Sequence, residues 1–277
     1  MYAVAAALLV GLLAPLALAA PTAEMVLTPA GYRPATSVHE IPADAALAHV
    51  GSEIHVVSFN GTVLKKVAAA TRPTPVKEAV SALQTGWVAY ASWMNEDSSP
   101  ISSFTTTWTT IFLFNSIEPE DMSAILQPVL QYGPSAAGGG SFWSVATWYL
   151  APSSTFFTSP VRTFAGATLH GIITLTSFSR SSFNYNSQFT NIGGTFLSIS
   201  STVQLTYATE TLEVYGVTAK SDYPAGSTVF SGINLKLANG NTPSVSWDHQ
   251  DDTADRLSTI VDTDGATNAR ITIDYDA

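Results

Sequence analysis

From residue 86 to its end the chain is a succession of short segments rich in Val, Ile, Thr and aromatic residues, each closed by Gly, Pro, Asn or Ser. Such residues favour strands and the closing residues favour turns, and no segment has a helical repeat of useful length. The segments are GWVAYASW, FTTTWTTIFLFN, SAILQPVLQYG, SFWSVATWYL, TLHGIITLTSF, FNYNSQF, LSISSTVQLTYA, ETLEVYGV, TVFSGINLKL, SVSWDH and ARITIDYD. About ten short strands need two packed layers to bury their apolar faces, so the pattern predicts an all-β fold, a two-sheet antiparallel β-sandwich of jelly-roll type.

The amino-terminal residues form an apolar run without a charge that ends in Ala17-Leu18-Ala19, the small-x-small pattern of a signal-peptidase site. The run is interrupted at Gly11 and Pro15 and is short for a membrane span, which leaves a membrane anchor as the alternative. We therefore expect residues 1–19 to be a signal peptide and the protein to be secreted, without stable insertion in a membrane.

The chain contains no cysteine, although a secreted protein passes through an oxidising compartment. Disulfides and a thiolate nucleophile are excluded, so the stability of the fold must come from its core, for which 46% hydrophobic residues suffice. The sequon Asn60-Gly61-Thr62 makes Asn60 a candidate glycosylation site.

Charge divides the chain into two parts, because the excess of acids that gives a net charge of −10 lies beyond residue 78. The earlier part holds an apolar run with an Asn60-Gly61 turn, which predicts a small hairpin, and then a linker with Pro73 and Pro75. We expect residues 20–79 to be a propeptide-like segment with its linker, and residues 80–277 to be the sandwich domain. An amino-terminal arm packed permanently on the body is the alternative.

The acidic body argues against nucleic acid as a partner, because phosphate binding needs a basic stripe and its cations do not cluster. No HExxH, Gly-rich phosphate loop or GxSxG sequence occurs. The acids of DHQDDTAD (residues 248–255) are interpreted as a solvated loop, with calcium as the alternative. We expect neither a metal nor a cofactor.

Two pairs of polar residues are the candidates for chemistry. Gln127 and Gln131 lie four residues apart in a predicted strand, so both amides point to one face and need partners or a ligand. Glu210 and Glu213 lie three residues apart in another, so they face opposite sides and one of them points inward, where burial raises a carboxyl pKa.

Four sequences in order, AILQ at 124–127, TWY at 147–149, TLHGIITLT and ETLEVY, resemble the secreted fungal glutamic peptidases, the eqolisins. The resemblance implies a concave, concanavalin A-like sandwich on which Gln127 and Glu213 form the catalytic dyad. It further implies a protein or peptide substrate. We expect a monomer, and activity best in acid because the carboxylate must pass a proton to the leaving amine. We expect Gln131, Glu118 and Trp148 to contact the substrate.

In that mechanism the Glu213 carboxylate is the general base for a water, and the Gln127 amide orients the water and donates to the oxyanion. The chain departs from the family where the motif WVGIDG would stand: it has FLFNSIEP, with Glu118 as the acid. Thr147 replaces another acid, and VYGVTAKSD replaces an acidic run.

Three other interpretations remain open. One is a relative that keeps the fold without catalysis. Another is a carbohydrate-binding sandwich whose Trp and Tyr side chains stack on glucan sugars while the glutamines bind hydroxyls. In the third, Gln127 and Gln131 are paired amides of a structural ladder and Glu213 faces water.

Overall fold

The computed structural model describes residues 24–69, 86–108, 113–217, 220–223 and 225–276. In this part of the chain nearly all regular structure is strand, with two short 3₁₀ turns at Ala35–Ser37 and Lys220–Asp222 and no α-helix. None of the described residues forms a helix of the length and hydropathy needed to cross a membrane.

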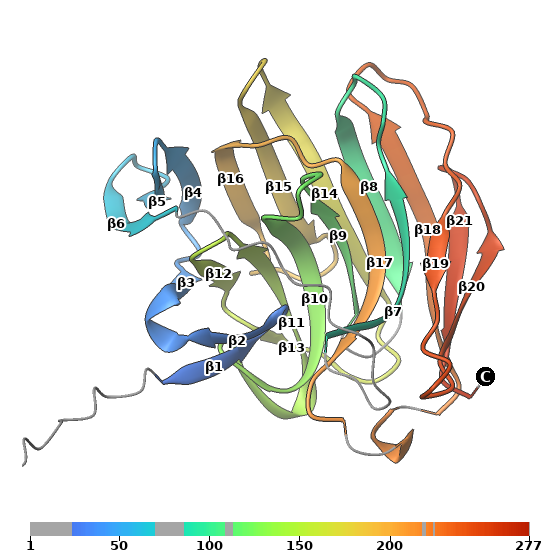
Figure 1. Cartoon of the computed structure of the whole chain (residues 1–277). Helices are drawn as coiled ribbons and strands as arrows, with labels where there is room; N and C mark the ends of the chain where they lie inside the picture. The colour runs from blue at the N-terminus through green and yellow to red at the C-terminus, as the bar shows by residue number, and fades with distance from the viewer. Residues whose placement is uncertain (1–23, 70–85, 109–112, 218–219, 224, 277) are drawn as a thin grey trace, which may run out of the picture.

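The first sheet has nine strands in the order β19-β7-β17-β9-β10-β11-β12-β3, with β13 beside β11 (Figure 1). Its pairs are antiparallel except β12 with β3, which is parallel. The strands are β3 (Val38–Ile41), β7 (Gly86–Met94), β9 (Leu113–Glu118), β10 (Ile125–Ser135), β11 (Gly138–Leu150), β12 (Thr155–Thr158), β13 (Val161–Arg162), β17 (Tyr207–Val214) and β19 (Asp248–Gln250).

The second sheet has ten strands in the order β20-β21-β18-β8-β14-β15-β16-β4-β5-β6, again antiparallel but for the parallel pair β16 with β4. The strands are β4 (Ala45–Val50), β5 (Glu53–Ser58), β6 (Val63–Ala68), β8 (Ile101–Trp108), β14 (Leu169–Phe178), β15 (Phe183–Phe189), β16 (Leu197–Thr202), β18 (Ser227–Leu237), β20 (Ser258–Thr263) and β21 (Ala269–Asp274).

The two sheets pack face to face (Figure 1), and the buried apolar side chains between them form one large cluster. Leu126 and Leu130 of the first sheet and Phe104 and Ile173 of the second are each no more than 1% exposed in this cluster. Burying each such side chain contributes about 1.5–3 kcal/mol, which is how the fold is stable without a disulfide. The predicted all-β, two-sheet sandwich is confirmed.

The amino-terminal segment is joined to both sheets. Strand β3 extends the first sheet and β4 the second, and β4, β5 and β6 form a meander whose last turn holds Asn60-Gly61, so the predicted hairpin is confirmed. A separate two-stranded hairpin, β1 (Met25–Thr28) with β2 (Gly31–Pro34), lies against β10 (Figure 1). The predicted signal peptide (1–19) and the linker around Pro73 and Pro75 lie outside the described residues.

Candidate functional site: the outer face of the nine-stranded sheet

The face of the nine-stranded sheet that points away from the second sheet carries its own apolar cluster, and we call it the outer face. Phe114, Val129, Ala146 and Trp148 are among its buried members, and each alternates along its strand with a residue of the main core. Ala30 and Val38 of the amino-terminal segment pack on the same cluster. The outer face is therefore covered in this structure.

Gln127 lies on the outer face with its whole side chain buried, at 0% exposure. It is level with Trp148 of β11. On the other side β9 pairs Ile117 with Leu126 and Phe114 with Val129, which places Ser116 opposite Gln127. Neither amide atom of Gln127 has a hydrogen-bond partner among the described residues. An unpaired buried amide costs about 1–3 kcal/mol, so its place in this face calls for a ligand or a reacting group.

Gln131 lies on the same face, as its spacing from Gln127 predicts, but its amide is occupied. Its nitrogen donates to the carbonyls of Gly133 and Gly138, at 3.4 and 3.1 Å, and its oxygen accepts from Ser135 at 3.0 Å. A Cβ on Gly139, which has φ +106, would lie 2.7 Å from that nitrogen and 2.3 Å from the Gly133 carbonyl. Gln131 thus holds the turn between β10 and β11, which is a structural role but not the ladder of paired amides with Gln127.

The two glutamates of β17 face opposite sides of the sheet, and the prediction that one of them points into the sandwich is confirmed. Glu210 is 0% exposed in the core and accepts a hydrogen bond from the Thr106 hydroxyl of the second sheet. Burial raises its pKa well above the ordinary value, against the effect of that bond.

Glu213 points to the outer face and is 2% exposed. Its Oε1 accepts the Ala30 N–H at 2.8 Å and the Tyr215 hydroxyl at 2.5 Å. Burial raises the pKa of Glu213 to about 7, although both hydrogen bonds oppose the rise. Ala30 holds the left-handed conformation at φ 73, which costs about 1–2 kcal/mol and aims its N–H at the carboxylate.

The register separates Gln127 from Glu213. Strand β17 pairs Thr209 with Ser116, so Thr209 is the residue of β17 level with Gln127, two strands away. Glu213 lies four residues further along, which corresponds to about 10 Å across the strands and about 13 Å along them. The structure therefore places both predicted dyad residues on one face but does not bring their side chains into contact.

Glu118 lies nearer to Gln127. Its carboxylate accepts a hydrogen bond from the Ser116 hydroxyl at 3.4 Å, and Ser116 is the residue opposite Gln127. The Ser116 and Thr209 hydroxyls are 2.6 Å apart, and Thr211 donates to Thr209 at 3.0 Å. Sequence reasoning missed Ser116 and Thr209, although the alternation that places Glu118 on the outer face also places Ser116 there.

Trp148 is 0% exposed beside Gln127 and its ring is 5.0 Å from that of Phe157, centroid to centroid. Its indole N–H, like the Gln127 amide, has no partner among the described residues. Two other tryptophans, Trp93 and Trp143, pack against the main core. The described part of the chain has no tryptophan among its exposed large apolar side chains, whereas two tyrosines, Tyr32 and Tyr132, are exposed.

Away from the outer face, Asn60 is exposed in its turn, where its Oδ1 accepts the Thr62 N–H at 2.9 Å. Within the described ranges no group of three or more His, Asp or Glu side chains could hold a metal ion.

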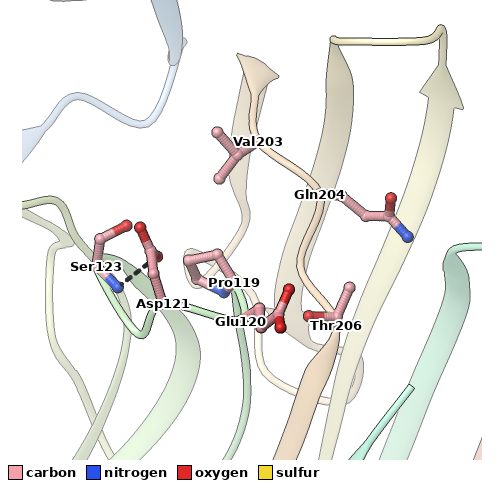
Figure 2. A pocket seen from close by; sticks show the side chains of 7 residues that line it. All are labelled: Pro119, Glu120, Asp121, Ser123, Val203, Gln204 and Thr206. Atoms are coloured by element: carbon pink, nitrogen blue, oxygen red, sulfur yellow. Dashed lines mark hydrogen bonds between the residues drawn. The ribbon is translucent and has the colours of Figure 1, made fainter. Parts of the chain in front are cut away.

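An open hollow of about 610 Å³ lies at the end of β9, immediately after Glu118 (Figure 2). One wall is the loop of Pro119, Glu120, Asp121 and Ser123, and the other is the segment that enters β17, with Val203, Gln204 and Thr206. The Thr206 N–H donates to the Glu118 carbonyl at 2.7 Å, which ties the two walls together. The hollow brings solvent close to the end of the strand that carries Glu118.

No family model matches the sequence, and no curated protein matches it. Two solved structures are similar in fold, both of scytalidoglutamic peptidase, one with a peptide-based transition-state analog and one with a transition-state analog inhibitor. Each is 14% identical and covers 69% of this chain and 98% of its own, with TM-scores of 0.44 and 0.45 respectively. The assignment of function therefore rests on the outer face itself.

Proposed function

We propose that the protein is a secreted endopeptidase that hydrolyses peptide bonds on the outer face, with Gln127 and a carboxylate acting on a water molecule. The observation that carries the proposal is the Gln127 amide, which is buried without a partner among the described residues while carboxyl groups lie on the same face. A binding amide and a general base are the two groups that direct water attack requires in the absence of a metal or a nucleophile.

In the reaction the carboxylate takes a proton from the water as the water oxygen attacks the scissile carbonyl carbon. The oxyanion that develops accepts a hydrogen bond from the Gln127 NH₂ group, which is pre-oriented in a site of low dielectric constant. The protonated carboxyl then donates its proton to the leaving nitrogen, and the C–N bond breaks. The products are an acid and an amine, and the carboxylate is regenerated.

Operation in acid is part of the proposal. Two buried carboxyls, Glu210 and Glu213, have raised pKa values, so the folded state prefers their protonated forms. The net charge of −10 at pH 7 also falls in magnitude in acid, which reduces self-repulsion.

We also propose that residues 20–79 act as a pro-segment over the site. The Ala30 N–H holds Glu213, the Ala136 N–H donates to the Leu27 carbonyl at 2.7 Å, and Ala30 and Val38 pack on the outer-face cluster. A peptide must displace these contacts to reach Gln127. Cutting the linker turns an intramolecular cover into a separate chain that dilution can release.

The experiment replaces Pro73–Pro75 with the recognition site of a specific protease and follows cleavage of an unfolded protein between pH 2 and 7. The intact chain is expected to cleave slowly, and the cut and diluted chain at least tenfold faster. The same cut chain at high concentration is the control, since the segment then stays bound. A folded, cut and diluted protein that cleaves nothing at any pH would favour a binding protein instead.

A further inference from the structure

The second reacting group of the proposed site can be chosen from the register of the sheet. We propose that Glu118, rather than Glu213, is the carboxylate that activates the water beside Gln127. This inference rests on the proposed function, because it assigns a residue to that reaction. Its basis is the placement of Glu118 against Ser116, the residue opposite Gln127.

The first step is the position of the Glu118 side chain. Strand β9 alternates, so Phe114, Ser116 and Glu118 share the outer face. Glu118 is the diagonal neighbour of Gln127 on the adjacent strand, a relation that places side chains about 7–8 Å apart at the backbone and within reach of long groups. The contact of 3.4 Å between Glu118 Oε1 and Ser116 Oγ shows that the carboxylate leans along β9 toward the residue opposite Gln127.

The second step is the orientation of Glu213. Its Oε1 accepts a hydrogen bond from the hydroxyl of Tyr215. Tyr215 follows Glu213 by two residues and Thr209 precedes it by four, so the carboxylate is turned away from Thr209, toward the carboxyl-terminal end of β17. The residue of β17 level with Gln127 is Thr209, which carries no charge and is hydrogen-bonded to Ser116 and Thr211. Glu213 therefore fixes the turn at Ala30. The position of β17 that is level with Gln127 holds a hydroxyl group, not a carboxyl group.

The third step is the environment of Glu118. The side chain is 5% exposed, and the hollow of Figure 2 begins at the next residue, Pro119. Its backbone is fixed by pairing with Tyr207 and by the Thr206 N–H. The Ser116 hydroxyl donates to the carboxylate and holds it on the outer face. A water between Gln127 and Glu118 can thus lose a proton to Glu118 while its oxygen attacks the carbonyl carbon.

The test compares Glu118→Gln and Glu213→Gln in the protein cut at the linker, with an internally quenched peptide as substrate. Glu118→Gln is expected to lower kcat by about 10²- to 10⁴-fold with little change in KM, because only proton transfer is lost. Glu213→Gln is expected to lower kcat less than tenfold. Glu120→Gln, an exposed carboxyl two residues after Glu118, is the matched control for charge and is expected to match the wild type.

Three results overturn the inference. Loss of activity in Glu213→Gln with normal turnover in Glu118→Gln would return the role to Glu213. If Glu118→Gln instead unfolds at a lower temperature and regains full activity when it is assayed in the cold, Glu118 has a structural role. A wild type that cleaves no peptide would remove the proposed function and this assignment with it, whereas the first two results leave the proposed function standing.

Discussion

Replacing Gln127 with Leu is expected to stabilise the protein and to abolish most of its activity. In the part of the chain that the structure describes, the two buried amide atoms of Gln127 have no partners, so an apolar side chain of similar size removes a desolvation cost of about 1–3 kcal/mol. The same change removes the donor to the oxyanion, and loss of one such donor lowers kcat by about 10²- to 10³-fold. Urea unfolding and peptide cleavage by one preparation measure both effects.

Gln131→Leu is the matched control for that experiment. The Gln131 amide is hydrogen-bonded to Gly138, Gly133 and Ser135, so the substitution removes three part-buried hydrogen bonds from the turn and lowers the free energy of unfolding. If the free energy of unfolding rises in Gln127→Leu and falls in Gln131→Leu, Gln127 is a residue kept for function. A Gln127→Leu protein that is less stable than the wild type would instead make Gln127 part of a structural ladder.

The free energy of unfolding is expected to fall as the pH rises from about 4.5 to beyond 7. Burial raises the pKa of Glu213 to about 7 in the folded state, above that of the unfolded chain, so the folded protein binds the proton more tightly. The stabilisation is complete below the unfolded pKa and is lost as the pH passes the folded one. A shift of this size corresponds to about 3 kcal/mol. Glu210, with a pKa also raised by burial, adds a loss in the same direction.

Urea unfolding at pH 4, 6 and 8 measures this dependence. Glu210→Gln and Glu213→Gln each replace a titrating group by a neutral one of the same shape, so each should flatten the profile, and the double variant should flatten it most. A wild type that is more stable at pH 8 than at pH 4 would show that neither carboxyl is buried in solution as it is here.

The two-sheet fold follows from local features of the sequence. Alternation in AILQPVLQ sends Leu126 and Leu130 to the core and the two glutamines to the outer face, and this needs no knowledge of partner strands. The parallel pairs of β3 with β12 and of β4 with β16 could not be predicted from the sequence. They join segments more than 100 residues apart, and such pairing leaves no local pattern.

The candidate site was predictable in its faces but not in its register. The alternation of side chains along each strand predicts which residues share a face with Gln127 or with Glu213. The distance between these two side chains, however, depends on which residue of β17 pairs with Ser116. That pairing spans 93 residues of sequence and is set by the packing of the whole sheet. The role of Gln131 in the turn was likewise hidden, because it depends on how the chain folds back at Gly138 and Gly139.

The central claim is that water, directed by Gln127 and a carboxylate, hydrolyses a peptide bond on the outer face. The most direct measurement is cleavage of an unfolded protein in H₂¹⁸O by the protein cut at the linker, with the new termini analysed by mass spectrometry. The account predicts one ¹⁸O in each new carboxyl group in the wild type, and a loss of product of about 10²- to 10³-fold in Gln127→Leu. Intact substrate at every pH from 2 to 7, or equal cleavage by Gln127→Leu, would contradict it.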